Sequence, residues 1–143
     1  MIFTLALLAF LVWYGTREYR HHQATIRRVP HRIHVNGTRG KSSVTRLITG
    51  GLQEGGIRTL CKTTGTMPCY LDPAGEQVRI QRIGKANIIE QVKVARRAVS
   101  LGFDALVVEC MAVLPGNQKL AEDQMIHATI GVITNVRADH LDE

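Results

Sequence analysis

The sequence of 143 residues has few aromatic side chains, and they are unevenly placed. It contains three Phe, three Tyr and one Trp, and four of these lie within the first fourteen residues. Proteins that bind single-stranded nucleic acid commonly stack bases on aromatic side chains beside basic ones. The formal net charge is +6, but the basic residues are not interleaved with aromatic residues. We therefore expect no nucleic-acid partner.

Cysteine is also scarce, and the three cysteines are far apart in the sequence. Cys61, Cys69 and Cys110 form no C-x-x-C pair and do not have the spacing of a zinc site. They do not resemble the disulfide framework of a small secreted domain. The pattern predicts free thiols in a reducing compartment.

The chain lacks an apolar run of the roughly 20 residues that cross a bilayer comfortably. Its first apolar run, from Ile2 to Tyr14, is shorter than this and is followed by basic residues. A secretory signal peptide would place positive charge before the run and a small-residue cleavage site after it. Here the charge follows the run, and residues 15–18 make a poor cleavage site.

We therefore expect an uncleaved membrane-anchor helix over residues 1–16 and a basic juxtamembrane linker over residues 17–31. Positively charged residues beside a membrane segment stay on the cytoplasmic side. This predicts a single-pass protein of the cell membrane whose residues 32–143 face the cytoplasm. The alternative is a buried helix of a soluble domain, for which the apolar run is also short enough.

A glycine-rich turn follows, between a predicted strand and a predicted helix. Residues 32–35 have strand character, and residues 44–52 carry apolar side chains at helical spacing. The turn between them contains Gly-x-x-Gly-Lys-Ser, which points backbone N–H groups inward beside the positive end of the next helix. That arrangement suits a polyphosphate. The residues expected to bind it are Asn36, Gly37, Thr38, Arg39, Gly40, Lys41, Ser42 and Ser43.

Lys41 and Ser42 have the most specific expected roles in this turn. Lys41 would contact the outer phosphates, and the Ser42 hydroxyl would hold Mg²⁺, which prefers hard oxygen ligands. The match to the general phosphate-loop pattern is incomplete, because Val35 stands where that pattern has its first glycine. The alternative is an ordinary glycine turn with a surface lysine, but the flanking strand and helix favour the phosphate loop.

Two further predicted strands end in residues that suit the same site. Residues 57–61 predict a strand, and the polar segment 62–66 follows it, where open α/β sheets place ligands. Residues 105–109 form an apolar run that is typical of a buried parallel strand and ends in Glu109. A carboxylate there is placed to bind Mg²⁺ beside the phosphate loop, and the alternative is a surface acid.

A β-hairpin and a helix are predicted between these two strands. The hairpin covers residues 69–82 around a turn signal, and the helix runs from residue 84 to about residue 101. Asn87 stands near the start of that helix. Its side chain is either a plain N-cap or a group that faces the reaction centre, and one side chain could serve both roles.

The last segment ends in an imidazole between two acids. A short helix is predicted over residues 118–125 and a strand over residues 127–135. The strand leads into Asp139, His140 and Asp142. A neutral imidazole at a strand end could hold a second metal ion, with an acid orienting its other nitrogen. Lone histidines are more often structural, which is the alternative here.

Four segments together resemble the Mur ligase superfamily, and in particular its bacterial poly-γ-glutamate ligases. These segments are residues 36–47, 62–66, 109–113 and 135–142. The resemblance implies an α/β fold with a mostly parallel sheet of the phosphate-loop NTPase type, here the incomplete Mur ligase central domain. This domain would cover residues 32–143, and the N-terminal anchor helix would precede it. ATP and Mg²⁺ are the implied cofactors.

The resemblance also implies the reaction of an ATP-dependent amide ligase in capsule polymer synthesis. ATP would phosphorylate the terminal carboxylate of a growing poly-γ-glutamate chain, and the acyl phosphate would react with the amine of an incoming glutamate. Lys41, Asn87 and His140 would act at the reaction centre. Ser42 and Glu109 would hold one Mg²⁺, and His140 would hold a second metal ion. Other membrane subunits of a synthase and export complex are the implied partners.

Members of the superfamily carry further metal- and adenine-binding residues downstream of these segments. We therefore expect the chain to be the front part of a longer ligase and to be inactive alone. Two alternatives stay open: a membrane-tethered NTPase, which would release ADP without glutamate, and a non-catalytic nucleotide-binding subunit. A ligase for folate or a cell-wall precursor is a third alternative, which the predicted membrane anchor disfavours.

Overall fold

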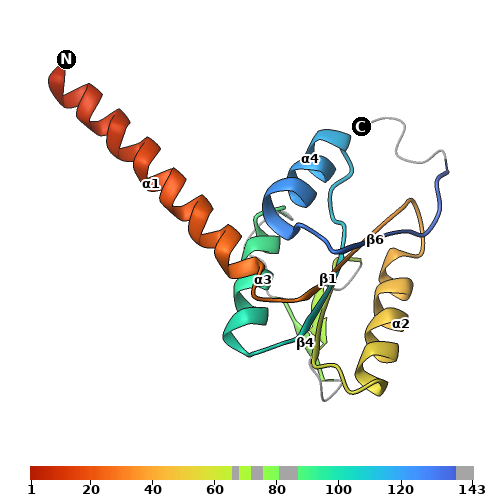
Figure 1. The fold of residues 1–143 in the computed structure, drawn as a ribbon. Coiled ribbons are helices and arrows are strands. Elements are labelled where there is room, and N and C mark those ends of the chain that lie inside the picture. Colours follow the sequence, from red (N-terminus) through yellow and green to blue (C-terminus); the bar gives the residue numbers. More distant parts are fainter. Residues whose placement is uncertain (66–67, 72–75, 81–86, 138–143) are drawn as a thin grey trace.

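The computed structural model describes residues 1–65, 68–71, 76–80 and 87–137. These residues form one sheet with helices on both of its faces (Figure 1). The strands are β1 (His31–Asn36), β2 (Thr59–Thr63), β3 (Cys69–Leu71), β4 (Gln77–Arg79), β5 (Ala105–Glu109) and β6 (Ile130–Ile133). The helices are α1 (Ile2–Ile26), α2 (Lys41–Glu54), α3 (Glu90–Ser100), α4 (Pro115–Leu120) and the π-helix η1 (Ala121–Ile126).

The sheet is mostly parallel, as the sequence predicts. Its strand order is β4-β3-β2-β5-β1-β6. Strands β2, β5, β1 and β6 are parallel, and β3 and β4 continue the sheet as the predicted antiparallel hairpin. The hairpin turn and the first residues of the predicted helix at residue 84 lie outside the described residues. Because the parallel strands share one direction, their carboxyl ends meet at one edge of the sheet.

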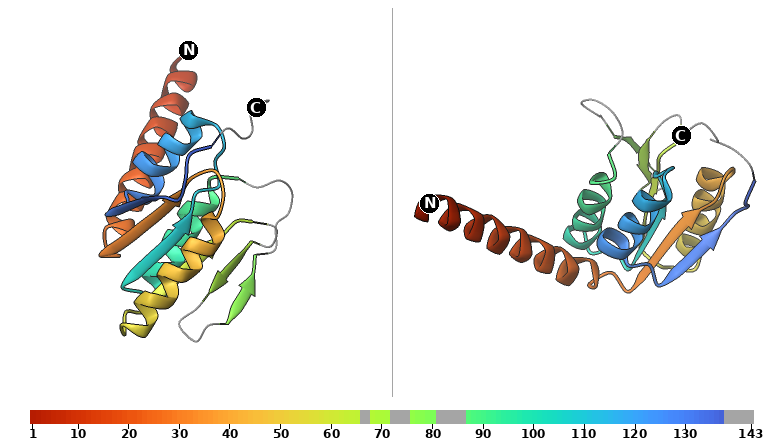
Figure 2. Two further views of the ribbon diagram at one scale, coloured as in Figure 1. Left: turned by 90° about the vertical axis from the view of Figure 1, so that its right-hand side faces the viewer. Right: turned by 90° about the horizontal axis from the view of Figure 1, so that it is seen from above.

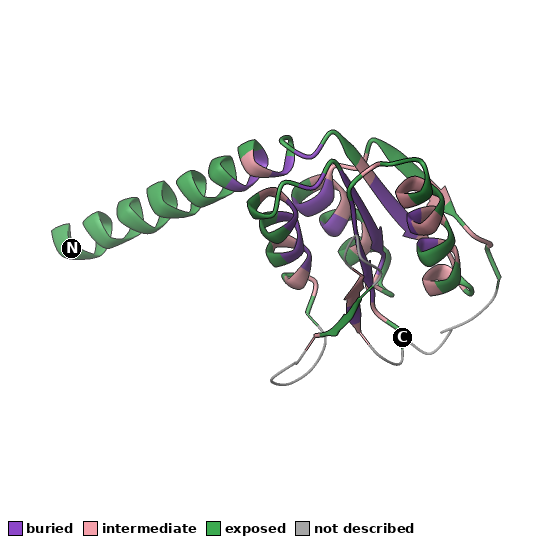
Figure 3. Ribbon diagram, turned by 90° about the horizontal axis from the view of Figure 1, so that it is seen from below, coloured by how far each residue is buried: buried purple, intermediate pink, exposed green. Residues whose placement is uncertain are grey.

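The core is divided between the two faces of the sheet (Figures 2 and 3). On one face, Ile33, Val35 and Val107 pack against apolar side chains of α2. On the other face, Leu106 and Val108 pack against α3, η1 and the end of α1. All five residues of β5 are buried, which is typical of a parallel strand covered on both faces.

Helix α1 is a single helix of 25 residues, of which only the last turns contact the rest of the domain. His22 donates from Nε2 to the Met125 carbonyl at 2.8 Å, and Gln23 donates to the Gln124 carbonyl at 2.9 Å. Ile26 is fully buried in the core. The first half of the helix projects from the domain, as Figures 1 and 2 show.

The expected transmembrane helix is corrected by the structure. Within the described parts of the chain, no helix is both long enough and apolar enough to cross a membrane. The physical reason is that α1 is apolar only as far as Tyr14 and carries Arg17, Glu18 and Arg20 in its next turns. The expected anchor and the first part of the expected basic linker thus share one continuous helix, which ends at Ile26.

The segment predicted as one helix over residues 118–125 contains two elements. Helix α4 begins earlier, with Pro115 at its first position, where the missing N–H of proline is no loss. It continues directly into the π-helix η1, which ends where His127 adopts a left-handed φ of 48°. Strand β6 follows and is shorter than the predicted strand over residues 127–135.

Candidate functional site

The glycine turn joins β1 to α2 and depends on glycine at two positions. Gly37 has a φ of 129°, and a Cβ there would lie 2.2 Å from Thr134 Oγ1 and 2.9 Å from the Asn135 carbonyl oxygen. Gly40 has a φ of 78° and stands immediately before α2. Residues with side chains adopt such φ values rarely. Glycine therefore lets the turn pass close to the end of β6 and enter the helix.

The turn is held by the segment that follows β6, and Asn135 makes three of these hydrogen bonds. Its side chain accepts a hydrogen bond from the Arg39 amide at 3.1 Å and donates to the Arg39 carbonyl at 2.9 Å. Its own carbonyl accepts from the Thr38 amide at 3.0 Å. Asn135 thus fixes the middle of the turn. Asn135 belongs to one of the segments that resemble the family, but no sequence pattern indicates this role.

Lys41 lies over this turn at the start of α2. Its Nζ donates to the Gly37 carbonyl at 2.7 Å and to the Thr38 carbonyl at 3.2 Å. The ammonium group is therefore held at the positive end of α2, where anions are stabilised. This is the position that the sequence predicts for a lysine that contacts phosphate.

Ser42 and Glu109 meet at the carboxyl edge of the sheet. The Ser42 hydroxyl donates to Glu109 Oε2 at 2.8 Å, and the Thr64 amide donates to the same oxygen at 2.7 Å. Glu109 is only 4% exposed. A Cβ at Gly65 would lie 2.9 Å from Ser42 Oγ, so glycine lets this loop approach α2 closely. The structure therefore brings together three segments that were each predicted separately.

The donors at this point fit Mg²⁺. A serine hydroxyl and a carboxylate are the hard oxygen ligands that the ion prefers, and it usually takes its other ligands from water and substrate phosphates. Among the described residues, no group of three or more His, Cys, Asp or Glu side chains is placed to hold a metal ion. Ser42 and Glu109 would thus hold the ion in cooperation with a phosphate, and not as a closed protein site.

A second amide links the turn to the segment after β5. Asn36 accepts a hydrogen bond from the Gly37 amide at 2.7 Å and donates to Gln118 Oε1 at 3.0 Å. Gln118 in turn donates to the carbonyls of Val113 at 2.9 Å and Ala112 at 3.3 Å. The loop that follows Glu109 is therefore tied to the start of the turn. No sequence pattern indicates this role of Gln118.

Beneath Glu109 lies a buried polar network. Lys62 is fully buried, and its Nζ lies 3.5 Å from Gln91 Oε1 and 3.5 Å from Glu90 Oε2. Gln91 is also fully buried and donates to the Glu109 carbonyl at 3.3 Å. Buried polar groups of this kind are normally hydrogen-bonded and rigid. The network connects α3 to the strand end that carries Glu109.

His34 forms a partly buried ion pair on the strand that leads into the turn. Its Nδ1 lies 2.7 Å from Glu122 Oε2, and the other Glu122 oxygen accepts from the Ala128 amide at 2.7 Å. Burial lowers the pKa of His34, but the neighbouring Cys110 sulfur and Glu122 carboxylate more than offset this and raise it to about 9. The hydrogen bond to His34 lowers the pKa of Glu122. The imidazole is therefore charged at neutral pH.

The remaining predicted site residues are less closely connected to this centre. Asn87 is exposed, and its Oδ1 accepts from the Ile89 amide at 3.0 Å, which is a local cap before α3. Ser43 is exposed in the first turn of α2. His140, Asp139 and Asp142 lie outside the described residues. All three cysteines are buried free thiols, as predicted.

Comparison with known proteins agrees with this geometry. Residues 35–143 match the family model described as the Mur ligase middle domain. The chain is 45% identical over 145 residues to the capsule biosynthesis protein CapB of Bacillus anthracis, which covers 99% of this chain and 31% of that relative. It is 44% identical over 136 residues to the PGA synthase CapB of Bacillus subtilis (strain 168), which covers 94% of this chain and 35% of that relative. The chain therefore spans about a third of the length of these curated relatives.

Proposed function

The chain belongs to the Mur ligase family, and we propose that it supplies the phosphate- and metal-binding part of an ATP-dependent ligase that extends poly-γ-glutamate for a capsule. One observation carries this proposal. Lys41, Ser42 and Glu109 come from two different elements and converge at the carboxyl edge of the sheet, beside a glycine turn. The names of the two relatives, capsule biosynthesis protein and PGA synthase, support capsule polymer synthesis as the function.

The proposed reaction has two steps. In the first, a carboxylate oxygen at the end of the polymer attacks the γ-phosphorus of ATP, and ADP leaves. In the second, the amine of an incoming glutamate attacks the acyl carbon, phosphate leaves, and the nitrogen loses a proton to give the amide. The Lys41 ammonium and the backbone N–H groups of the turn would stabilise charge on the phosphate oxygens during the first step.

Ser42 and Glu109 would hold Mg²⁺, whose charge, when the ion is bound, offsets that of the phosphate oxygens. We propose His140 as a ligand of a second metal ion and Asn87 as a contact at the reaction centre. The support for both is their position in segments that resemble the family. Asn87 also precedes α3, whose Gln91 binds the Glu109 carbonyl.

We also propose that the protein attaches to the cell membrane, with its ATP site in the cytoplasm, and acts with other membrane subunits of a synthase and export complex. The support is the exposed apolar half of α1, in which Phe3 is 81% exposed and Trp13 is 55% exposed. Exposed apolar patches of this kind mark membrane or protein contacts. Arg17 and Arg20 follow this half and would lie beside the anionic lipid headgroups of the cytoplasmic face.

The proposal is tested by measuring ADP release with and without glutamate. A ligase requires glutamate for ADP release, and Lys41→Ala abolishes both ADP release and polymer formation. Lys93→Ala is the matched control, because Lys93 is exposed on α3 and has no part in the turn. ADP release without glutamate would support the NTPase alternative. Polymer formation by the Lys41→Ala variant would contradict the ligase.

The 143-residue chain alone gives a second test. We expect it to bind Mg-ATP without forming polymer, because it spans only about a third of the length of its curated relatives. Nucleotide binding is measured with a fluorescent ATP analogue. ADP release that depends on both Mg-ATP and glutamate in the purified chain would contradict this expectation.

A further inference from the structure

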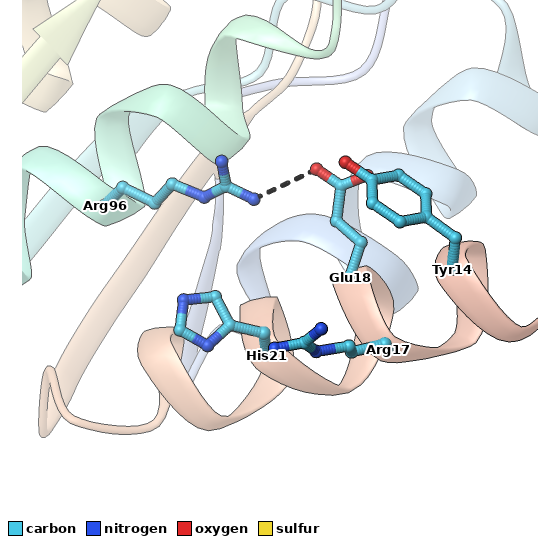
Figure 4. A pocket seen from close by; sticks show the side chains of 5 residues that line it. All are labelled: Tyr14, Arg17, Glu18, His21 and Arg96. Carbon is cyan, nitrogen blue, oxygen red and sulfur yellow. Dashed lines mark hydrogen bonds and ion pairs between the residues drawn. The ribbon is translucent and has the colours of Figure 1, made fainter.

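A pocket lies between α1 and α3, on the face of the sheet opposite α2 (Figure 4). Its volume is about 370 Å³, within the usual range of small-molecule sites. Four of its residues come from one face of α1, and the fifth comes from α3. They are Tyr14, Arg17, Glu18, His21 and Arg96.

The pocket carries two guanidinium groups and one carboxylate. Arg96 Nη2 donates to Glu18 Oε1 at 3.3 Å, and the two side chains are 44% and 55% exposed. An exposed ion pair like this contributes little to stability, so Arg96 can turn toward another anion at low cost. Arg17 also lines the pocket, and its guanidinium carbon lies 5.5 Å from the centre of the Trp13 ring. Both arginines suit a phosphate oxygen.

An apolar stripe leads along α1 to this pocket. Phe3, Leu7, Phe10 and Tyr14 follow one another at spacings of four, three and four residues, which places them on one side of the helix. Each of the four is at least 48% exposed. Phe10 stacks on Tyr14 with ring centres 6.1 Å apart. The apolar stripe therefore leads directly into the pocket, because Tyr14 belongs to both and no polar side chain interrupts the row.

We propose that this pocket binds the phosphate headgroup of an anionic phospholipid, with the acyl chains along the apolar stripe. The ligand must combine an anion with an apolar tail, since the basic pocket and the stripe are continuous. Aromatic residues such as Trp13 and Tyr14 favour the level of lipid headgroups, and basic residues there bind anionic lipids. The inference builds on the proposed membrane attachment but is independent of the ligase reaction.

Binding of the full chain to vesicles tests the inference. Vesicles of phosphatidylcholine alone are compared with vesicles that also contain phosphatidylglycerol, at physiological salt to screen long-range attraction. Arg96→Gln is expected to weaken binding to the anionic vesicles about fivefold. Glu18→Gln is expected to strengthen it, because it releases Arg96 and removes the negative charge. Neither variant is expected to change binding to phosphatidylcholine vesicles.

Arg97→Gln is the matched control. It makes the same charge change at the next position of α3, but Arg97 lies over the Tyr70 ring and does not line the pocket. Unchanged binding in Arg97→Gln supports the pocket, whereas equal losses in both arginine variants would show general electrostatic attraction and overturn it. All three changes are at exposed positions, and circular dichroism checks that each variant is folded.

The remaining outcomes separate the pocket from the membrane attachment. If the chain binds both vesicle types equally, the apolar half of α1 attaches it and the headgroup inference fails. If it binds neither, the proposed attachment fails as well. If soluble polyglutamate binds the chain, and Arg96→Gln but not Arg97→Gln abolishes this, the pocket recognises an acidic polymer and the lipid inference is overturned.

Discussion

Ser42 donates a hydrogen bond of 2.8 Å to Glu109, although the two residues are 67 positions apart in the chain. Ser42 belongs to the first turn of α2, and Glu109 is the last residue of β5. Both therefore stand at element ends that face the same edge of the sheet. This contact joins α2, whose first turn would bind the phosphate, to β5, whose last residue would bind the metal ion.

The Ser42–Glu109 contact predicts how metal dependence responds to mutation. Glu109→Gln keeps an acceptor for Ser42 and Thr64 but removes the charge that would bind Mg²⁺. We expect the affinity for Mg-ATP to fall by about 10–100-fold, since even second-shell partners of a metal have effects of that size. The measurement is a titration with a fluorescent ATP analogue, with Mg²⁺ and with a chelator in its place.

The chelator arm is the control for this variant. Without Mg²⁺ the variant should bind nucleotide as well as the unmodified chain or better, because a negative charge near the phosphates is gone. An equal loss in both arms would show that Glu109 only holds the local structure.

Asn135 predicts a second effect on nucleotide binding, through the position of the turn. Asn135→Ala removes both side-chain hydrogen bonds to the Arg39 backbone. Each such bond contributes about 1 kcal/mol, so the loss of both should weaken ATP binding by up to about 30-fold. Asn117→Ala, at an exposed position of α4, is the control and should leave affinity unchanged. Unaltered ATP affinity in Asn135→Ala would show that the turn is held by other contacts.

The sequence predicts the centre of the site better than its supports. Lys41, Ser42 and Glu109 stand at strand and helix ends, and in a parallel sheet such ends meet at one edge, so their meeting is predictable. Asn135 and Gln118 contact the turn from segments 96 and 82 residues away, through side-chain geometry that no local pattern encodes. Their contribution emerges only when β6 and α4 are placed beside β1.

Helix α3 shows how a polar residue can belong to the buried face of a helix. Its apolar residues at helical spacing do pack against the core, with Ala95 fully buried and Val92 and Val99 partly buried. The most buried positions of the helix also include Gln91, which is fully buried because it binds the Glu109 carbonyl and accepts from Lys62. A polar side chain with buried partners belongs to the core, and the partners of Gln91 lie on strands β2 and β5.

Two glycines predict opposite effects on stability. Gly37→Ala brings a Cβ within 2.2 Å of Thr134 Oγ1 at a φ of 129°, so we expect it to lower the free energy of unfolding by at least about 2 kcal/mol. Gly51→Ala lies within α2 with open space around it, so we expect it to raise this energy by up to about 1 kcal/mol. Urea unfolding followed by circular dichroism measures both. A stabilising Gly37→Ala would contradict the observed approach of the turn to β6.

The His34–Glu122 pair predicts that stability decreases in alkaline solution. The pKa of His34 rises from 6.5 in the unfolded chain to about 9 in the folded one, so its contribution is complete below about pH 6.5 and is lost as the pH rises through about 9. The shift corresponds to about 3 kcal/mol. The pKa of Glu122 is lowered, so its contribution is complete above its unfolded value of 4.5 and is lost as the pH falls through the lower, folded value.

Urea unfolding between about pH 5 and about pH 10 tests this prediction. The unmodified chain should be most stable between about pH 4.5 and about pH 6.5, where both contributions are complete. Glu122→Gln keeps a hydrogen-bond partner for His34 but removes the charge, so it should reduce the loss of stability between about pH 6.5 and about pH 9. The variant should retain part of this pH dependence, because the Cys110 sulfur also raises the pKa of His34. An equally steep loss in Glu122→Gln would show that the alkaline transition belongs to other groups.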